Sequence, residues 1–141
     1  MYLLDTNVIS EMRRRTRMAP AVAAWAIQVR PVDLYLSVAT VMELETGAML
    51  VARRDPERGR VLAAWISQHV LRAFDGRILP IDLPVARRCA ALHVPNPRPM
   101  NDAMIAATAL SHRLTVVTRN IRDFEGTGVP TVNPWDWVTR S

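Results

Sequence analysis

The chain has 141 residues, a length that predicts one domain spanning residues 1–141. Half of the residues are hydrophobic and 22% are charged, which excludes a disordered chain, and no apolar run reaches the ~18–20 residues of a membrane span. We expect a cytoplasmic protein, because the chain has no basic, secretory-type start and its one cysteine, Cys89, has no partner for an internal disulfide. The net charge of +5 is compatible with nucleic-acid binding, although many small proteins that bind none carry a similar charge.

Short apolar runs alternate along the chain with longer stretches in which apolar residues recur every three or four positions, the spacing of a helix. Residues 2–4 predict a strand, and helices are expected from Thr6 to about residue 15 and from Pro20 to about residue 29. Residues 34–38 predict a second strand, followed by helices over residues 40–52 and from Asp55 to about residue 75. A short strand at 78–81 precedes helices over 83–93 and 101–112, and strands at 115–118 and 129–132 flank a turn at 120–124.

Strands separated by helices are typical of a parallel sheet that is covered on both faces. The predicted fold is therefore a three-layer α/β/α domain with a central parallel sheet of four to five strands. In such sheets, active sites form outside the carboxyl ends of the strands. Four acidic residues fall at the ends of predicted strands or near the starts of the following helices: Asp5, Glu43, Asp102 and Asp123. We expect these four carboxylates to share one cleft.

Each carboxylate also has a purely structural interpretation. Asp5 and Asp102 suit the N-termini of helices. Glu43 has the spacing of a capping box with Thr40, and Asp123 has arginines beside it with which it could pair. Gathered in one cleft, however, the carboxylates repel each other and need a cation. Oxygen donors without histidine or cysteine are typical of Mg²⁺ or Mn²⁺ sites.

The segments that contain these acids occur in an order typical of one protein family. They are YLLDTNVIS (2–10), LYLSVATVMELETG (34–47), NDAMIAATAL (101–110) and VVTRNIRDFEGTGVPTVNPW (116–135). Together they resemble PIN-domain ribonucleases and, more narrowly, the VapC-type toxins of bacterial type II toxin–antitoxin systems, in the FitB-like branch. The resemblance spans nearly the whole chain, and its most specific part is DAMIAATA followed by T-x-N-x-x-D-F.

The resemblance implies a PIN-like fold and a metal-dependent endoribonuclease with Mg²⁺ or Mn²⁺ as cofactor. It identifies the four acids as the family's acidic quartet, with Asp5 and Asp102 as direct metal ligands and the other two acting through water. It also implies an RNA substrate, a homodimer, a VapB-type antitoxin across the active-site groove, and no membrane association. Four residues match polar supporting positions of the family: Thr6, Asn7, Thr118 and Asn120.

The charge outside the quartet is strongly positive. Removing four carboxylates from the 13 acidic residues leaves nine against 18 arginines, a net of +9. We expect the groove walls to attract an RNA backbone, and the candidate contacts, Arg98, Arg119 and Arg122, adjoin the acidic motifs. The alternative is that these arginines form exposed ion pairs with nearby acids, which are worth about 0–1 kcal/mol.

Two further expectations concern surfaces. Glu45 lies two positions after Glu43, which turns it to another side of the helix, so we expect it outside the quartet. The apolar helical stripes around Trp25 and Trp65 exceed what one small domain easily covers. We therefore expect one of these two stripes to be a dimer surface.

Three other functions remain compatible with the residues. A housekeeping RNA-processing nuclease would have the same site but no antitoxin gene beside it. A phosphoryl-transfer enzyme on an open α/β sheet would be expected to carry D-x-D, whereas Asp5 is followed by Thr6 and Asn7. A non-catalytic binding module would have no need of all four acids.

Overall fold

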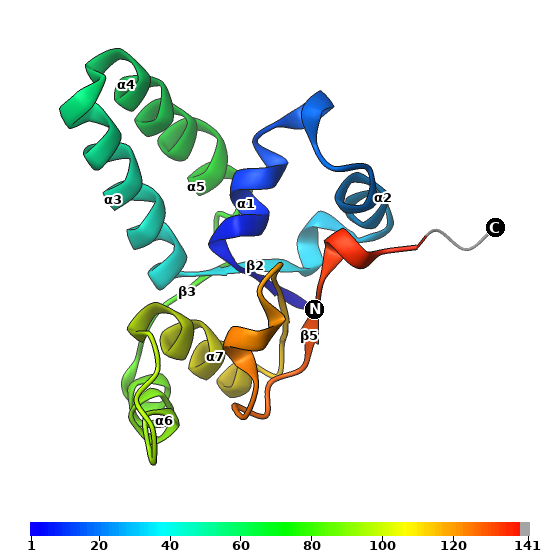
Figure 1. Cartoon of the computed structure of the whole chain (residues 1–141), viewed down its shortest axis with the longest axis vertical. Helices are drawn as coiled ribbons and strands as arrows, with labels where there is room; N and C mark the ends of the chain where they lie inside the picture. The colour runs from blue at the N-terminus through cyan, green and yellow to red at the C-terminus, as the bar shows by residue number, and fades with distance from the viewer. Residues whose placement is uncertain (139–141) are drawn as a thin grey trace.

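The centre of the protein is a five-stranded sheet in which the strand order is β3-β2-β1-β4-β5 (Figure 1). The structure is a computed structural model, and it describes residues 1–138. Every neighbouring pair of strands is parallel, which confirms the predicted α/β class. The strands are β1 (Tyr2–Leu4), β2 (Leu34–Ser37), β3 (Ile78–Leu79), β4 (Thr115–Val117) and β5 (Thr131–Val132).

Helices follow the strands as the apolar spacing predicted, with some differences at their ends. They are α1 (Thr6–Met12), α2 (Pro20–Gln28), α3 (Val38–Arg54), α4 (Pro56–Trp65), α5 (Leu71–Ala73), α6 (Leu83–Leu92) and α7 (Met100–His112). A π-helical segment, Ile66–Val70, joins α4 to α5 and was not predicted. No helix within residues 1–138 is both long and apolar enough to cross a bilayer.

Helix α3 begins two residues earlier than predicted. Its N-cap is Ser37, whose hydroxyl accepts a hydrogen bond from the backbone N–H of Ala39 at 3.0 Å. Thr40 therefore lies inside the first turn, and the capping box that its spacing with Glu43 indicated is not formed. This leaves the Glu43 carboxylate without a capping role.

The sheet separates two apolar layers. On one face, Leu4 packs with α1, α2, α3 and the π-helical segment, and on the other, Leu3 packs with α7. Helix α6 then packs on the outer side of α7, where Cys89 is buried as a small apolar residue. Successive side chains of a strand point to opposite faces of the sheet, so Leu3 and Leu4 cover both faces of β1 with apolar groups, as a strand buried on both faces requires.

The aromatic stripe on α2 belongs to the interior. Trp25 is 1% exposed and its ring meets that of Tyr2 edge to face, with centroids 5.5 Å apart. Val22 is fully buried as well. Trp65 is half-buried and packs against the same core. The Trp25 stripe is therefore excluded as a dimer surface, and Trp65 offers only part of its ring.

Helices α3 and α4 form a hairpin that projects from the sheet (Figure 1). Gly59 of α4 is buried where the two helices come closest. A Cβ at this position would lie 2.4 Å from Ala52 Cβ and 2.5 Å from Ala52 Cα. The absence of a side chain at Gly59 is thus what permits the close packing of α4 on α3.

We expect opposite effects from alanine at two helical glycines. Gly59→Ala should lower the free energy of unfolding by about 1–2 kcal/mol, because overpacking against Ala52 outweighs the gain in helix propensity. Gly47→Ala is the matched control, since nothing lies within 4 Å of a Cβ there, and it should raise stability by about 0.5–1 kcal/mol. Urea denaturation measures both, and a stabilising Gly59→Ala would contradict the close contact.

Candidate active site

The acidic quartet comes from four segments that meet at the carboxyl edge of the sheet. Asp5 directly follows β1 and caps α1. Glu43 lies in the second turn of α3, and Asp102 in the first turn of α7. Asp123 lies in the short 3₁₀ turn η4 (Ile121–Phe124), after β4. Because β1 lies between β2 and β4, Asp5 is the central member of the group.

Asp5 is buried and held by three hydrogen bonds. Its Oδ1 accepts from the backbone N–H of Thr6 at 2.8 Å, and its Oδ2 accepts from Thr118 Oγ1 at 2.8 Å and Asn7 Nδ2 at 3.2 Å. Burial raises the pKa of this carboxyl, the three hydrogen bonds lower it, and the charge of Asp123 raises it again. An ionised carboxylate accepts about four hydrogen bonds or ligand contacts, so one lone-pair position of Asp5 remains.

Burial and mutual repulsion also act on the other members. Burial raises the pKa of Asp102 to about 6, and the charges of Asp123 and Asp5 add to the increase. Burial likewise raises the pKa of Glu43, with further contributions from Asp5 and Asp102. The charges of the four carboxylates therefore act on one another, so the four acids form one cluster at the predicted edge of the sheet.

The hydroxyl of Thr6 is the unpaired polar group of this cluster. Thr6 Oγ1 is buried and makes no hydrogen bond of normal geometry within residues 1–138. It lies near enough to Glu43 to lower the pKa of that carboxyl. A buried hydroxyl without a partner is costly in a folded protein, which is consistent with a site that a ligand completes.

The remaining supporting residues fix the geometry around Asp5. Thr118 Oγ1 donates to Asp5 and accepts from Asn7 Nδ2 at 3.3 Å and from the backbone N–H of Asn120 at 3.0 Å. The contribution of Asn120 thus comes from its main chain. The structure therefore brings all four predicted supporting positions to the cluster.

The donor chemistry of the quartet fits a hard divalent cation. None of the ion pairs within residues 1–138 involves a quartet member; they join Arg14 to Glu11, Arg30 to Asp33 and Arg60 to Glu57. No three His, Cys, Asp or Glu side chains in this part of the chain are arranged to coordinate one ion together. Mg²⁺ does not need three protein ligands, because it keeps several waters and is usually held by one or two carboxylates. The quartet therefore still suits Mg²⁺.

The three candidate RNA-contacting arginines have different surroundings. Arg98 is partly buried, and its Nε donates to the Leu92 carbonyl at 3.1 Å, so it ties the end of α6 to the following loop. Arg119 and Arg122 are exposed on the loop after β4. Within residues 1–138, none of the three forms the predicted alternative ion pairs.

Glu45 points away from the quartet, as predicted. It lines a cavity between α3 and α4 with Met49 and Arg60, and it does not contribute to the raised pKa of Glu43.

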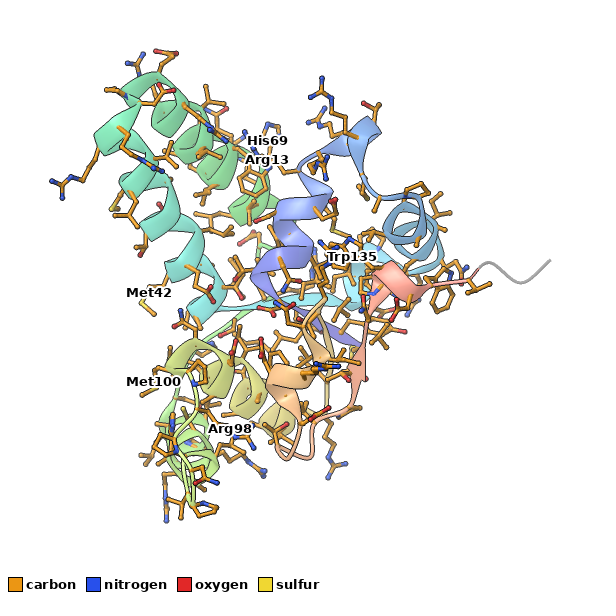
Figure 2. The ribbon with its side chains drawn as sticks, in the orientation of Figure 1. Arg13, Met42, His69, Arg98, Met100 and Trp135 are labelled. Atoms are coloured by element: carbon orange, nitrogen blue, oxygen red, sulfur yellow. The ribbon has the colours of Figure 1, made fainter. Side chains whose placement is uncertain are left out.

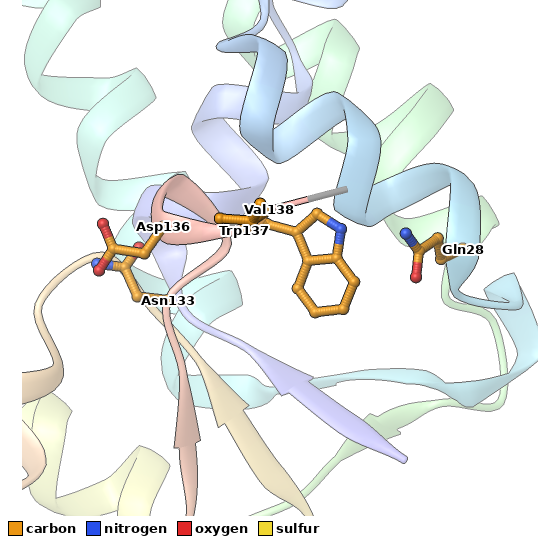
Figure 3. Close-up of a pocket in the computed structure, with 5 residues that line it drawn as sticks. All are labelled: Gln28, Asn133, Asp136, Trp137 and Val138. Atoms are coloured by element: carbon orange, nitrogen blue, oxygen red, sulfur yellow. The ribbon is translucent and has the colours of Figure 1, made fainter. Parts of the chain in front are cut away.

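A groove leads away from the acidic cluster between α1, α3 and α4. Its volume is about 320 Å³, and its lining includes Thr6 and Glu43 from the acidic cluster together with Arg13 and Trp65. A larger cavity of about 690 Å³ lies between α2 and the C-terminal segment, where Trp137 faces Gln28 (Figure 3). No quartet member lines this second cavity, so we assign the site to the acidic edge.

Sequence analysis missed two residues beside the site, Asn133 and Trp135. Asn133 Nδ2 donates to the Arg119 carbonyl at 3.3 Å, and Asn133 Oδ1 accepts from the Trp135 backbone N–H at 2.9 Å. The N-P-W sequence after the last strand was the available signal. It connects the C-terminal turn to the loop that follows β4.

A parallel α/β domain with four clustered acids at the carboxyl edge of β1 has the architecture of a nuclease of the PIN class. Residues 2–129 match the PIN domain, and the chain belongs to the PIN-domain family. It is 41% identical over 141 residues to Toxin FitB of Neisseria gonorrhoeae, covering 96% of this chain and 99% of that protein. It is 38% identical over 141 residues to VapC ribonuclease Y4jK of Sinorhizobium fredii, with the same coverage.

The three-dimensional structure agrees with these similarities. The crystal structure of FitAcB from Neisseria gonorrhoeae matches with a TM-score of 0.84 at 40% identity, covering 96% of this chain and 99% of that one. The structure of FitAB bound to an IR36 DNA fragment matches with a TM-score of 0.85 at 38% identity, covering the whole of both chains.

We expect Asp102→Asn to stabilise the metal-free protein at neutral pH. The pKa of Asp102 is about 6 in the folded chain and 3.8 as its ordinary value, so the folded state binds more protons between these pH values. The free energy of unfolding therefore falls as pH rises through this window, and the ionised carboxylate destabilises the fold above it. Asparagine stays neutral, so the variant should gain about 1 kcal/mol at pH 7, a value reduced for partial solvent screening.

Thermal unfolding in EDTA at pH 7 and at pH 3.5 measures this effect. The gain should become small at the lower pH, where Asp102 is protonated in the folded state and mostly protonated in the unfolded state. Glu45→Gln, outside the quartet, should show no such pH dependence. Equal stability of Asp102→Asn and the unmodified protein at pH 7 would show that neither burial nor the neighbouring charges destabilise the ionised Asp102 carboxylate.

Proposed function

We propose that this chain is a metal-dependent endoribonuclease that acts as the toxin of a type II toxin–antitoxin pair. The observation that carries the proposal is the quartet itself, four interacting carboxylates without an ion-pair partner in residues 1–138. Relatives of full length and 38–41% identity are named as a toxin and a VapC ribonuclease. A phosphoryl-transfer or binding role has no comparable support.

Some residues of the site bind the ion, and others orient the carboxylates that bind it. Asp5 and Asp102 are the proposed direct ligands of Mg²⁺ or Mn²⁺, with Glu43 and Asp123 acting through water. Thr118 and Asn7 keep the Asp5 carboxylate in one orientation through their hydrogen bonds. When bound, the ion supplies Lewis acidity, which makes a water nucleophilic at neutral pH and offsets charge on the leaving oxygen.

The groove beside Glu43 is the proposed place for inhibition by a VapB-type antitoxin. Structures similar to this chain include toxin–antitoxin complexes, among them FitAB and a complex from Klebsiella pneumoniae. A segment lying in the groove would cover Thr6 and Glu43 and so block access to the quartet. The proposed location of the pair is the cytoplasm, where RNA is available and the buried Cys89 stays reduced.

A second copy of the chain is the proposed partner of the edge beside the quartet. Met42 and Met100 are 51% and 58% exposed, and Val38 is 37% exposed. Met42 and Met100 lie on the same side of the molecule, at the starts of α3 and α7 (Figure 2). Exposed apolar side chains gathered at one edge are typical of protein interfaces.

We expect RNA cleavage to require a divalent ion and an intact quartet. EDTA should abolish cleavage and Mg²⁺ or Mn²⁺ restore it. Asp5→Asn and Asp102→Asn should each lower the cleavage rate by about a hundredfold or more, the scale lost when one preorganised electrostatic group is removed. Both should also weaken Mn²⁺ binding in calorimetry.

Glu45→Gln is the matched control for this experiment. It removes an acid from the same helix as Glu43 but outside the quartet, and cleavage should continue at the normal rate. Circular dichroism confirms that each variant is folded. A folded Asp102→Asn protein with normal turnover would contradict the metal-site assignment.

We expect a homodimer at micromolar concentration, measured by light scattering. Met42→Glu together with Met100→Glu should produce a monomer, because burying two new charges at an interface is unfavourable. Ile27→Glu is the control, since Ile27 is 84% exposed on α2 and should leave the dimer intact. A monomeric unmodified protein would refute this part of the proposal.

A further inference from the structure

The loop that follows β4 holds one arginine in a fixed position at the rim of the acidic site. The Arg119 backbone N–H donates to Asn7 Oδ1 at 3.1 Å, and Asn7 in turn donates to Asp5. The Arg119 carbonyl accepts from Asn133 at 3.3 Å. Both backbone groups of Arg119 are therefore bound, one of them directly to the hydrogen-bond network of the quartet.

The guanidinium of Arg119 lies over the ring of Trp135. Its central carbon is 5.1 Å from the ring centroid, which is within the range of a cation–π contact. Trp135 is itself half-buried against the core, and its backbone N–H is held by Asn133. One asparagine thus holds both partners of the stack, and the ring limits where the guanidinium can go.

Stacking leaves the donors of Arg119 available. Within residues 1–138 its guanidinium makes no ion pair and no hydrogen bond, and the residue is exposed. Arg77 provides the contrast, because it also lies over an aromatic ring, that of Phe74, but donates to the carbonyls of Pro31, Leu34 and Ala73. Arg77 is structural, whereas Arg119 has five N–H donors without a protein acceptor.

From this geometry we infer that Arg119 binds a phosphate of the RNA strand next to the one that is cleaved, and that Trp135 is the residue that positions it. The inference rests on the proposed function. An anionic backbone approaching four carboxylates needs a positive group at the rim, and a planar guanidinium matches phosphate geometry. Because the stack and the two backbone hydrogen bonds preorganise Arg119, less side-chain entropy is lost on binding.

The test is a double-mutant cycle on RNA binding. The full-length protein carries Asp102→Asn so that RNA stays intact, and a short fluorescent single-stranded RNA of mixed sequence is titrated at several salt concentrations. Arg119→Ala should weaken binding about fivefold to tenfold and reduce the slope of log affinity against log salt by about 0.7, the value for one phosphate contact on a single strand.

Trp135→Leu should weaken binding about twofold to fivefold, the worth of one exposed cation–π contact. In the Arg119→Ala background it should have no further effect, because the ring then has nothing to position. Arg53→Ala, which removes an exposed charge at the far end of α3, should leave the affinity and the salt slope unchanged. If the leucine variant is unfolded by thermal melting, the same cycle with Trp135→Phe replaces it, with a smaller loss of the same pattern.

Two results would overturn the inference. The first is an unchanged salt slope for Arg119→Ala, and the second is an equal loss from the Trp135 substitution with and without Arg119. RNA cleavage by the unmodified protein is measured in parallel. If that protein cleaves RNA while either result is found, the inference is wrong and the proposed function stands; if it neither binds nor cleaves RNA, both are wrong.

Discussion

The burial of mutually repelling carboxylates at one edge of the sheet is the constraint on which the rest of this structure depends. The fold holds Asp5, Glu43, Asp102 and Asp123 together although burial and mutual charge raise the pKa of three of them. The central strand, β1, positions the first of these acids. Asp5 follows the central strand, and Thr118, at the end of the neighbouring strand, donates to it at 2.8 Å. The hydrogen bonds to Asp5 favour its ionised form, while burial and the charge of Asp123 disfavour it, which leaves the cluster prepared for a cation.

The same edge of the sheet combines the negatively charged acidic cluster with positively charged arginines around it. Few of the 18 arginines are neutralised within residues 1–138, where the ion pairs join Glu11, Asp33 and Glu57 to arginines close by in sequence. Arginines near the site are held by other means: Arg119 by a ring and backbone hydrogen bonds, and Arg13 by a stack on Trp65 at 5.6 Å. Unpaired, stacked guanidinium groups keep their donors free, which suits a surface that meets a polyanion.

The helical hairpin of α3 and α4 forms part of the wall of the groove beside this edge. Gly59 lets α4 approach α3 closely, and the π-helical segment connects α4 to α5. Ile66, at the start of that segment, is 1% exposed and contributes both to the core and to the groove wall. The wall that faces Glu43 is therefore built from the same contacts that stabilise the domain. A change in the hairpin packing would alter the groove even without touching an acid.

The sequence by itself determined the parallel α/β class, a sheet of four to five strands and the four acids, because strand-length apolar runs and the parallel-strand rule place acids such as Asp5 and Asp123 at one edge. Local spacing misled where two motifs competed: Thr40 and Glu43 have capping-box spacing, but Ser37 caps the helix. Likewise, the spacing left open which of the Trp25 and Trp65 stripes faces a partner, and the structure buries Trp25 to 1% exposure, since exposure depends on what packs against a helix. Only the tertiary structure decided that Trp135, 16 positions after Arg119, lies beneath its guanidinium. A contact between two loops has no periodicity along the chain, so no sequence pattern records it.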